Sequence, residues 1–398
     1  MKKRFLFVIL VLCLIFAACD NGTVKKNNDE GSEVITTEYT VYDETTWKAA
    51  LSGIRSGGNN KLYVINVTGN FDVDGAILGS AIYSFGDVTG ITVSINGNYG
   101  ISLKTGTTGT LLYLNRDQTV VINDTDFKGN IAVSSSSLIQ TYYSNLTMAG
   151  SASVTNHTGT GAVYIVNGSF TMKDSARVAN NTNNSSQGGG LRLNNCTAVM
   201  TDNAEVRDNT ATYAGGVYQQ NGTFTMSGNA TVAGNTATQS VTGHGGGVYI
   251  TAATGTADFT MQGSAGVTGN TAEGSGGGIY ASSNNGSTAT VNMRGGVVSG
   301  NESKGGSGAQ CGGGGICVYS PNSEANTIFR IEAGAVYGNT YGSTPLQQTL
   351  RNYASGAGAA LFVKDFAKAY EASFSGTTWT NGTPLNTRDT SLEYIMPF

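Results

Sequence analysis

A pattern of apolar and polar positions recurs seven times between residues 146 and 340. Each copy has a Met or Ile, a Val five or six residues later, and an Asn or His three residues after the Val. The valines are Val154, Val178, Val206, Val232, Val267, Val298 and Val336, which are 24, 28, 26, 35, 31 and 38 residues apart. The internal spacing is kept while the period drifts, which predicts a solenoid of stacked coils joined by loops of variable length.

Each coil divides into three short arms. One reads Gly-Gly-aliphatic-Tyr, as in Gly246–Tyr249, the second reads Phe-Thr-Met, as in Phe224–Met226, and the third is the Val-x-x-Asn arm. Alternation along a strand turns the Phe and Met inward and leaves the middle position facing solvent. These middle positions are Thr147, Thr171, Val199, Thr225, Thr260, Asn292 and Arg330. The arms predict an all-β fold, a three-sided right-handed parallel β-helix with strands stacked about 4.8 Å apart.

The polar residue after each Val predicts a second kind of column. We expect an asparagine ladder at one turn, in which side-chain amides hydrogen-bond along the stack. Its members are Asn181, Asn209, Asn235, Asn270, Asn301 and Asn339. His157 holds the same position in the first regular coil, which indicates a role in the turn.

The segment before the repeats differs from them. Trp47, Ala50, Leu51 and Ile54 have helical spacing and follow Asp43, a good N-cap residue, so residues 38–60 predict an N-terminal cap with one short helix. We expect the β-helix over residues 61–340, with irregular early coils, and the last coil and C-terminal cap over residues 341–398. Caps are needed because the end coils of a solenoid otherwise expose strand edges.

The first residues read as a targeting segment. Three basic residues and twelve apolar ones precede Ala17-Ala18-Cys19, and twelve residues are too few to cross a bilayer as a helix. Ala17-Ala18-Cys19 resembles the lipobox of bacterial lipoproteins. That resemblance implies a signal peptide over residues 1–18, acyl chains such as palmitate on Cys19, and a membrane anchor. The polar residues 19–37 would then carry the lipid and form a flexible tether.

The repeats resemble a known group of proteins as well. Val232–Ala237 followed by Gly246–Tyr249 is similar to the repeats of chlamydial-type polymorphic membrane proteins and of spirochaete repeat lipoproteins. The resemblance implies a place in the cell envelope, at the outer membrane or cell surface rather than the inner membrane. Only 59 residues follow Asn339, too few for a twelve-stranded membrane barrel, so we expect the lipid to be the anchor.

Composition removes several classes of function. Charged residues are 12% of the chain, and no basic patch supports nucleic-acid binding. The two histidines, His157 and His244, are too few for a multi-histidine zinc site. No phosphate or dinucleotide motif is present. We therefore expect no metal, no cofactor and no nucleic acid, and a monomer whose partners are the membrane and a glycan or a host or envelope protein.

The corner after the Gly-Gly arm is the first candidate surface. The distance from the second Gly-pair position to the Met position is 10 in three coils and then 14, 15 and 16, so residues 251–258, 281–290 and 319–327 should stack into one protrusion. Such insertions often form the binding face of a solenoid. A binding surface would comprise Tyr218, Tyr249, Tyr280, Asn284, Asn285 and Asn322. Alternatively, the loops have drifted and the tyrosines only stabilise the sheet.

Two acids form the second candidate. Asp174 and Asp202 both lie two residues after their Met, and they share their coils with Arg177, Arg192, Glu205, Arg207 and Asp208. Adjacent carboxylates can perform acid–base chemistry, but a solvated charged face is the simpler interpretation. Cys311 and Cys317 are close enough in sequence to form a disulfide, or are two free thiols. We expect a non-catalytic envelope lipoprotein for adhesion or envelope interaction; the alternatives are a polysaccharide lyase or hydrolase and a purely structural surface protein.

Overall fold

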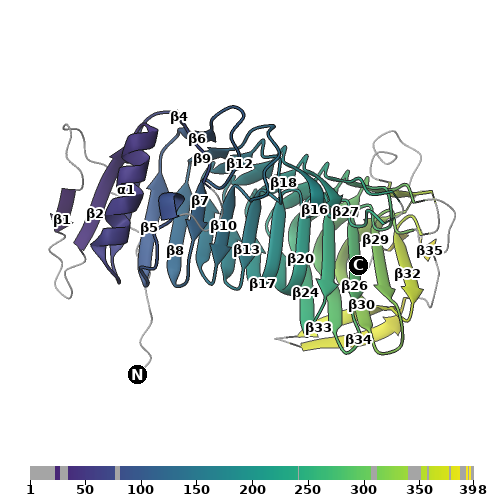
Figure 1. Ribbon diagram of the computed structural model, residues 1–398. Coiled ribbons are helices and arrows are strands. Elements are labelled where there is room, and N and C mark those ends of the chain that lie inside the picture. The colour runs from purple at the N-terminus through teal and green to yellow at the C-terminus, as the bar shows by residue number, and fades with distance from the viewer. Residues whose placement is uncertain are drawn as a thin grey trace, which may run out of the picture.

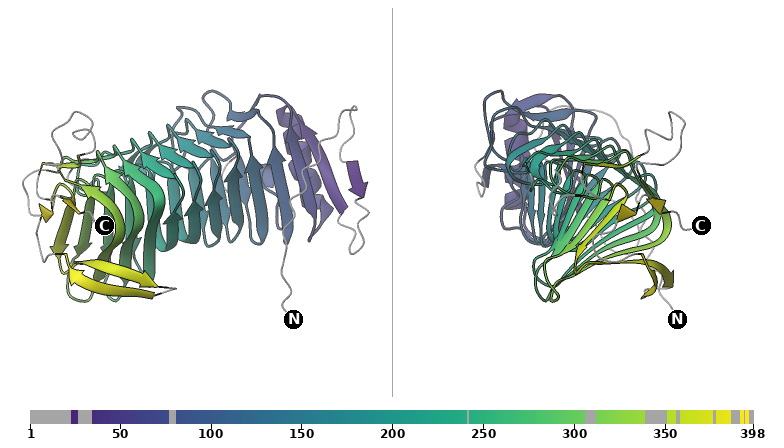
Figure 2. Two further views of the ribbon diagram at one scale, coloured as in Figure 1. Left: turned by 180° about the vertical axis from the view of Figure 1, so that it is seen from behind. Right: turned by 90° about the vertical axis from the view of Figure 1, so that its right-hand side faces the viewer.

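The computed structural model shows a right-handed parallel β-helix, a single elongated stack of coils (Figure 1). It describes residues 23–26, 35–76, 81–240, 242–305, 312–338, 351–355, 358–375, 378–385, 391–392 and 394–395. The predicted fold class is confirmed. Figure 2 shows that the coils stack in register along the axis, so each side of the stack is a long parallel sheet.

The three predicted arms form three rows of strands. The Gly-Gly arm contains β7 (Leu112–Leu114), β10 (Ile139–Tyr142), β13 (Val163–Val166), the first halves of β17 (Leu191–Met200) and β20 (Val217–Met226), β23 (Val248–Ala252), β26 (Ile279–Ser283), β29 (Ile316–Ser320) and β32 (Leu361–Asp365). The Phe-Thr-Met arm contains β2 (Ile35–Val41), β3 (Leu62–Val67), β5 (Ile91–Asn96), β8 (Gln118–Asn123), β11 (Asn145–Ala149), β14 (Ser169–Met172), the second halves of β17 and β20, the starts of β24 (Thr256–Thr268), β27 (Thr288–Ser299) and β30 (Asn326–Tyr337), and β33 (Lys368–Ser375).

The Val arm completes the set. It contains β4 (Phe71–Val73), β6 (Gly100–Leu103), β9 (Asp126–Lys128), β12 (Ser153–Thr155), β15 (Arg177–Ala179), β18 (Glu205–Arg207), β21 (Thr231–Ala233) and the ends of β24, β27 and β30. All seven repeat valines pair in one register, from Val154 to Val336. The Met column is likewise continuous from Met148 to Ile331.

A fourth short strand, which the sequence pattern did not reveal, follows the ladder position in six coils. These strands are β16 (Thr182–Gln187), β19 (Thr210–Tyr213), β22 (Thr236–Ala237), β25 (Thr271–Ala272), β28 (Glu302–Ser303) and β31 (Tyr353–Ala354), and they form a separate sheet. In five of the six coils the turn before them is tight because the residue that precedes the ladder position has positive φ, at Asn180, Asp208, Gly234, Gly269 and Gly300. Asn, Asp and Gly tolerate this conformation best.

Ladders of like side chains fill the interior. Phe224 and Phe259 stack with ring centroids 5.1 Å apart, and both are fully buried. Five of the seven middle positions of the Phe-Thr-Met arm are partly exposed threonines or valines, as expected. Asn292 is a correction, because it was expected to face solvent and is buried. Its Oδ1 accepts a hydrogen bond from Arg330 Nη1 on the next coil, and Arg330 also binds Asn381 of the C-terminal hairpin.

Both ends of the stack are closed. Helix α1 (Glu44–Gly57) begins at the N-cap Asp43 with a capping box to Thr46, and it packs its apolar face into the core, where Trp47 meets Phe127. β1 (Thr23–Lys26) pairs antiparallel with β2. At the other end β35 (Ser391–Leu392) and β36 (Tyr394–Ile395) pair antiparallel with β32 and β30. Antiparallel end strands cover edges that would otherwise template association.

The 3-10 helix η1 (Ala81–Tyr83) precedes β5 and contacts α1. β34 (Thr378–Pro384) forms an antiparallel hairpin with β33. In Figure 1 this hairpin lies at the lower right, beyond β30.

Candidate functional site

The asparagine column is a continuous hydrogen-bonded ladder inside the turn. In Asn235, the side-chain Nδ2 donates to the carbonyl of Val206 at 3.0 Å and to Asn270 Oδ1 at 2.9 Å. Its Oδ1 accepts from both the backbone N–H and the Nδ2 of Asn209, each at 3.0 Å. The same four hydrogen bonds recur at Asn209, Asn270 and Asn301. Asn181 makes three of them, because its Oδ1 accepts only from the backbone N–H of His157. The ladder amides therefore satisfy buried backbone groups of the turn, and their hydrogen bonds are made to the protein itself.

The last described position of the ladder is occupied by Asn352 and not by the expected Asn339. Asn301 donates to Asn352 Oδ1, and Asn352 donates to the carbonyls of Val298 and Tyr337. Asn352 thus occupies the position after Asn301. Asn339, which the spacing predicted for the ladder, lies outside the described residues.

The Gly-Gly pairs are explained by the ladder they face. A Cβ on Gly216 would lie 2.6 Å from the Gly247 carbonyl and 2.9 Å from Asn235 Nδ2, and one on Gly247 would meet Asn270 in the same way. Real Cβ atoms do not approach this closely, so a side chain here would displace the ladder. The glycine motif and the asparagine motif are therefore two sides of one contact.

His157 heads the ladder. Its backbone N–H donates to Asn181 Oδ1 at 3.0 Å, and its Nε2 lies 2.9 Å from the Ser136 carbonyl. Burial lowers the pKa of His157 to about 4, against a smaller opposing effect of the hydrogen bond to Ser136. The imidazole is thus neutral at pH 7 and acts as a structural hydrogen-bond donor.

The tyrosine column is less open than expected. Tyr249 lies edge-on between Tyr218 and Tyr280, with centroid distances of 5.5 and 4.8 Å. His244 stacks on Tyr280 at 4.4 Å, and its Nδ1 accepts from the Ser275 N–H. Tyr218 and Tyr280 are only 8% and 6% exposed. Of the two interpretations that the sequence left open, burial favours the one in which the tyrosines stabilise the sheet, because His244 stacks on Tyr280 and little of Tyr218 or Tyr280 is exposed.

The chemistry of this cluster follows from burial. Burial raises the pKa of Tyr218 to about 12 and that of Tyr280 well above its ordinary value. Burial also lowers the pKa of His244 to about 4, and Lys364 adds to the effect. The cluster is therefore neutral at pH 7 and stabilises the sheet.

The enlarged corner is an ordered ridge. Asn322 Nδ2 donates to Asn285 Oδ1 at 2.6 Å, Gly286 N–H donates to the Glu324 carbonyl, and Asn284 N–H donates to the Ala252 carbonyl. The three long loops therefore stack on one another, as the spacing predicted. Asn284 and Asn285 are exposed and Asn322 is half-buried. Part of the added length extends the strands: β24, β27 and β30 all begin five residues before the Met position, whereas β14 begins three before it.

The carboxylates of the charged cluster act as turn acceptors. Asp174 Oδ2 accepts from the Gly150 N–H at 3.0 Å, and Asp202 Oδ2 accepts from the Asp174 N–H at 3.2 Å. Both aspartates have positive φ at the same turn. Arg207 pairs with Glu205 and Asp208. The two aspartates stack on neighbouring coils as predicted, and each links its coil to the preceding one through the backbone.

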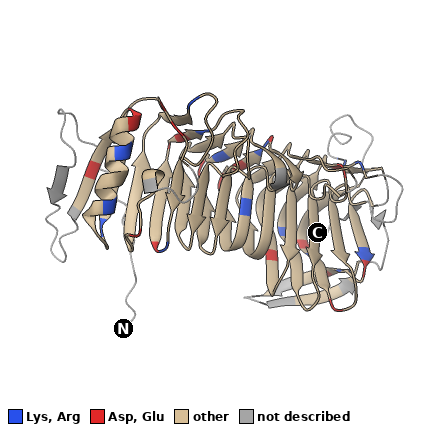
Figure 3. Ribbon diagram, in the orientation of Figure 1, with Lys and Arg blue, Asp and Glu red and all other residues tan. Residues whose placement is uncertain are grey.

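The structure separates Arg192 from this cluster. Arg192 lies on the Gly-Gly arm, with its guanidinium 4.7 Å from the ring centroid of Tyr164, an arrangement of cation–π type. Figure 3 shows that charges are sparse on the strands and gather at α1 and at the turns beside β12 and β18. The charged surface is thus a strip along one corner of the stack, formed by Asp174, Arg177, Asp202, Glu205, Arg207 and Asp208.

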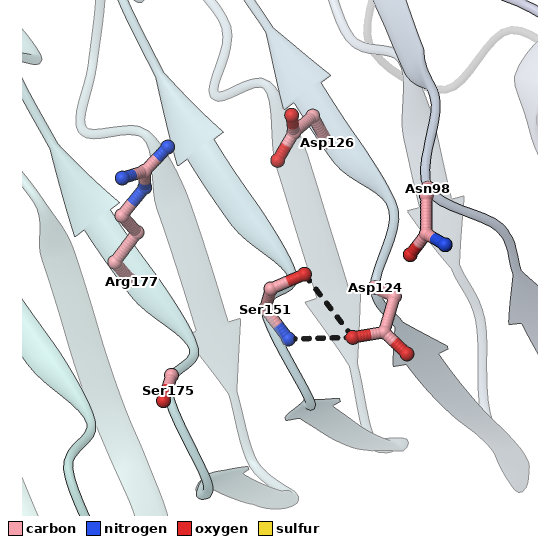
Figure 4. Close-up of a pocket in the computed structure, with 6 residues that line it drawn as sticks. All are labelled: Asn98, Asp124, Asp126, Ser151, Ser175 and Arg177. Carbon is pink, nitrogen blue, oxygen red and sulfur yellow. Dashed lines mark hydrogen bonds between the residues drawn. The ribbon is translucent and has the colours of Figure 1, made fainter.

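A pocket of about 290 Å³ lies at the N-terminal end of this strip. It is lined by Asn98, Asp124, Asp126, Ser151, Ser175 and Arg177, which come from four successive coils (Figure 4). Of these residues, sequence reasoning named only Arg177. Asp124 was detectable, because Ile122 pairs with Met148 and Asp124 lies two residues after it, as Asp174 does after Met172. The irregular spacing of the early coils concealed that alignment.

The cysteines divide between described and undescribed parts. Cys196 is a buried thiol, and burial raises its pKa to about 12. Cys317 is buried in an outer cluster with Tyr280 and Phe362. Cys311 and the expected lipidation site Cys19 lie outside the described residues, so the expected disulfide and lipidation stay predictions.

Within the described ranges, no group of three or more His, Cys, Asp and Glu side chains is placed to hold a metal ion. No helix in the same part of the chain has the length and apolarity needed to span a bilayer. Comparison with protein-family models, curated proteins and solved structures found no match.

Proposed function

We propose that this protein is a non-catalytic, lipid-anchored protein of a bacterial cell envelope, whose β-helix presents a ridged surface for adhesion or envelope interaction. The observation that carries the proposal is the ridge at the enlarged corner, where Asn285, Asn322 and their neighbours are held in place by contacts between coils. An ordered, polar and solvent-facing ridge is a preorganised surface that loses little conformational entropy on binding. The envelope location and the likeness to spirochaete repeat lipoproteins rest on the Cys19 segment and the repeats.

The absence of catalysis in this proposal rests on Asp174 and Asp202. Each uses a carboxylate oxygen to hold a backbone N–H of the neighbouring coil. A general acid must instead release and regain a proton at a position within reach of a substrate atom. A structural role explains both aspartates without a reaction.

Location and anchoring are tested in the native cell. Cys19→Ala should release the protein from the membrane fraction, while Cys196→Ala, which changes a buried thiol far along the chain, should leave it there. Protease added to intact cells should digest the unmodified protein if it lies on the cell surface. Membrane retention of the Cys19→Ala variant would refute the lipid anchor.

Binding is tested with the purified full-length chain. The expected result is retention on a glycan array or on envelope or host extracts, with no product released from polysaccharides. Exchanging residues 284–287 for a two-residue Asn-Gly turn should reduce that binding, whereas Asn229→Ala, at the corner between the Phe-Thr-Met and Val arms, should not. Depolymerase activity that is lost in Asp202→Asn would establish the carbohydrate-active alternative. If no glycan and no protein is retained specifically, the purely structural alternative is favoured.

A further inference from the structure

The pocket beside β9 contains two carboxylates that are each fixed by one oxygen. Asp124 Oδ1 accepts from the N–H and the hydroxyl of Ser151, at 2.7 and 3.1 Å (Figure 4). Asp126 Oδ1 accepts from the hydroxyl of Ser153. The second oxygen of each carboxylate has no partner among the described residues. Two negative groups are therefore oriented at one side of the pocket with acceptor capacity to spare.

The opposite side of the pocket contains the guanidinium of Arg177. In the parallel sheet Ser153 is the register neighbour of both Asp126, on the coil before it, and Arg177, on the coil after it. Arg177 therefore lies two coils from Asp126, about 10 Å along the stack. The guanidinium of Arg177 forms no ion pair or hydrogen bond with another described residue, although its backbone N–H donates to the Ala152 carbonyl within the sheet. This distinguishes it from Arg207 on the same strip, which pairs with Glu205 and Asp208. The guanidinium of Arg177 thus lines an open pocket whose other side is anionic.

We propose that this pocket binds the zwitterionic head of an amino acid, an ammonium and a carboxylate on one carbon. The carboxylate would lie on Arg177, which matches planar carboxylates with two parallel hydrogen bonds. The ammonium would lie between the open oxygens of Asp124 and Asp126, and Asn98 and Ser175 supply neutral polar contacts at the rim. A group of this length bridges the two coils between the charges.

The charges of the lining favour this ligand over a neutral sugar ring. The volume of 290 Å³ is at the lower limit of small-molecule sites, which span about 300–1,000 Å³. None of the six lining residues is aromatic, so the pocket offers no ring on which a sugar could stack. A small head group with both charges fits a small site whose side chains are charged or polar and that has an anionic and a cationic side.

The inference deepens the proposed envelope role and rests on it for the source of the ligand. Diamino acids of cell-wall peptides end in such a zwitterionic carbon, and free amino acids have one as well. Binding of the small molecule and binding of purified cell-wall sacculi therefore separate the two sources. Either source is consistent with the pocket.

The test is calorimetric titration of the full-length chain, in detergent, at low salt. meso-Diaminopimelic acid is the probe, with pimelic acid lacking the amines and cadaverine lacking the carboxylates as matched controls. We expect the probe to bind at least about tenfold more tightly than either control, because each control loses one charge-assisted contact. Arg177→Gln and Asp126→Asn should each weaken the probe about tenfold, while Arg207→Gln should leave it unchanged.

Several results would overturn the proposal. They are no binding of the probe, equal binding of pimelic acid or cadaverine, equal binding of glucuronic acid, or full binding by Arg177→Gln with an unchanged circular dichroism spectrum. The result also separates this pocket from the proposed function. If Arg177→Gln loses the probe but still adheres, the envelope role stands and does not depend on the pocket. If the unmodified chain binds the probe but no envelope or host component, the pocket stands and the proposed envelope role fails.

Discussion

Removing one side chain from the asparagine ladder is the most direct test of how this fold is stabilised. Asn235→Ala deletes two hydrogen bonds donated by Nδ2 and two accepted by Oδ1. The backbone N–H of Asn209 and the carbonyl of Val206 would be left without these partners in the interior, where the ladder side chains are fully buried. A buried group that loses its partner costs about 1–3 kcal/mol, so two such groups and a small cavity predict a loss of about 3–5 kcal/mol.

The assay is urea unfolding of the full chain followed by circular dichroism. Asn229→Ala is the control on the same coil, because its Nδ2 makes one exposed hydrogen bond to Asn203 and its loss should cost under about 0.5 kcal/mol. Since stacked coils can unfold in parts, the slope of the transition must be compared with that of the unmodified chain. A loss below about 1 kcal/mol in Asn235→Ala, with an unchanged slope, would refute the ladder as a main source of stability.

Three other changes follow from the same contacts. His157 has a folded-state pKa of about 4, below the ordinary 6.5, so the unfolded chain binds the proton first and the contribution of His157 to stability should fall by about 3 kcal/mol as the pH drops from above 6.5 to 4. His244 has a similar pKa and contributes in the same range, so His157→Asn should remove only the share of His157 from the pH profile of unfolding, and an unchanged profile would contradict the assignment. Phe259→Ala should cost about 3–5 kcal/mol in the same urea assay because it breaks the stack with Phe224 in a close-packed core, and a cost near zero would show that the core collapses to fill the gap. Gly247→Ala should lower the thermal midpoint, because its Cβ would lie 2.8 Å from Asn270 Nδ2, whereas Gly255→Ala has no neighbour within 4 Å and tests only the positive φ there.

The periodic part of the structure was predictable because its neighbours are set by register. Once the Met and Val columns are aligned, alternation determines which side chains are buried, and the pairings from Val154 to Val336 follow that alignment. The capping helix was predictable for a local reason, since Asp43 and the spacing from Trp47 to Ile54 suffice to define it. The ordered ridge was predictable in position, because the loop after the Gly-Gly arm lengthens from coil to coil toward the C-terminus.

What the spacing did not reveal depends on contacts between segments of free length. The His244 loop buries Tyr280, and Asn352 takes the ladder position after Asn301 from fifty-one residues away. The pocket joins Asp124 and Asp126, which come from early coils of irregular spacing, to Arg177 of a regular coil.

The sequence by itself thus determined the β-helix, its core columns and the turn that holds the asparagines. A repeated pattern can specify these because each coil meets the same neighbours at the same height. Only the tertiary structure decided which surface residues stay open, since loops outside the repeat fold over some columns and leave others exposed. The tyrosines were covered in this way, while Arg177 and the two aspartates that face it were not.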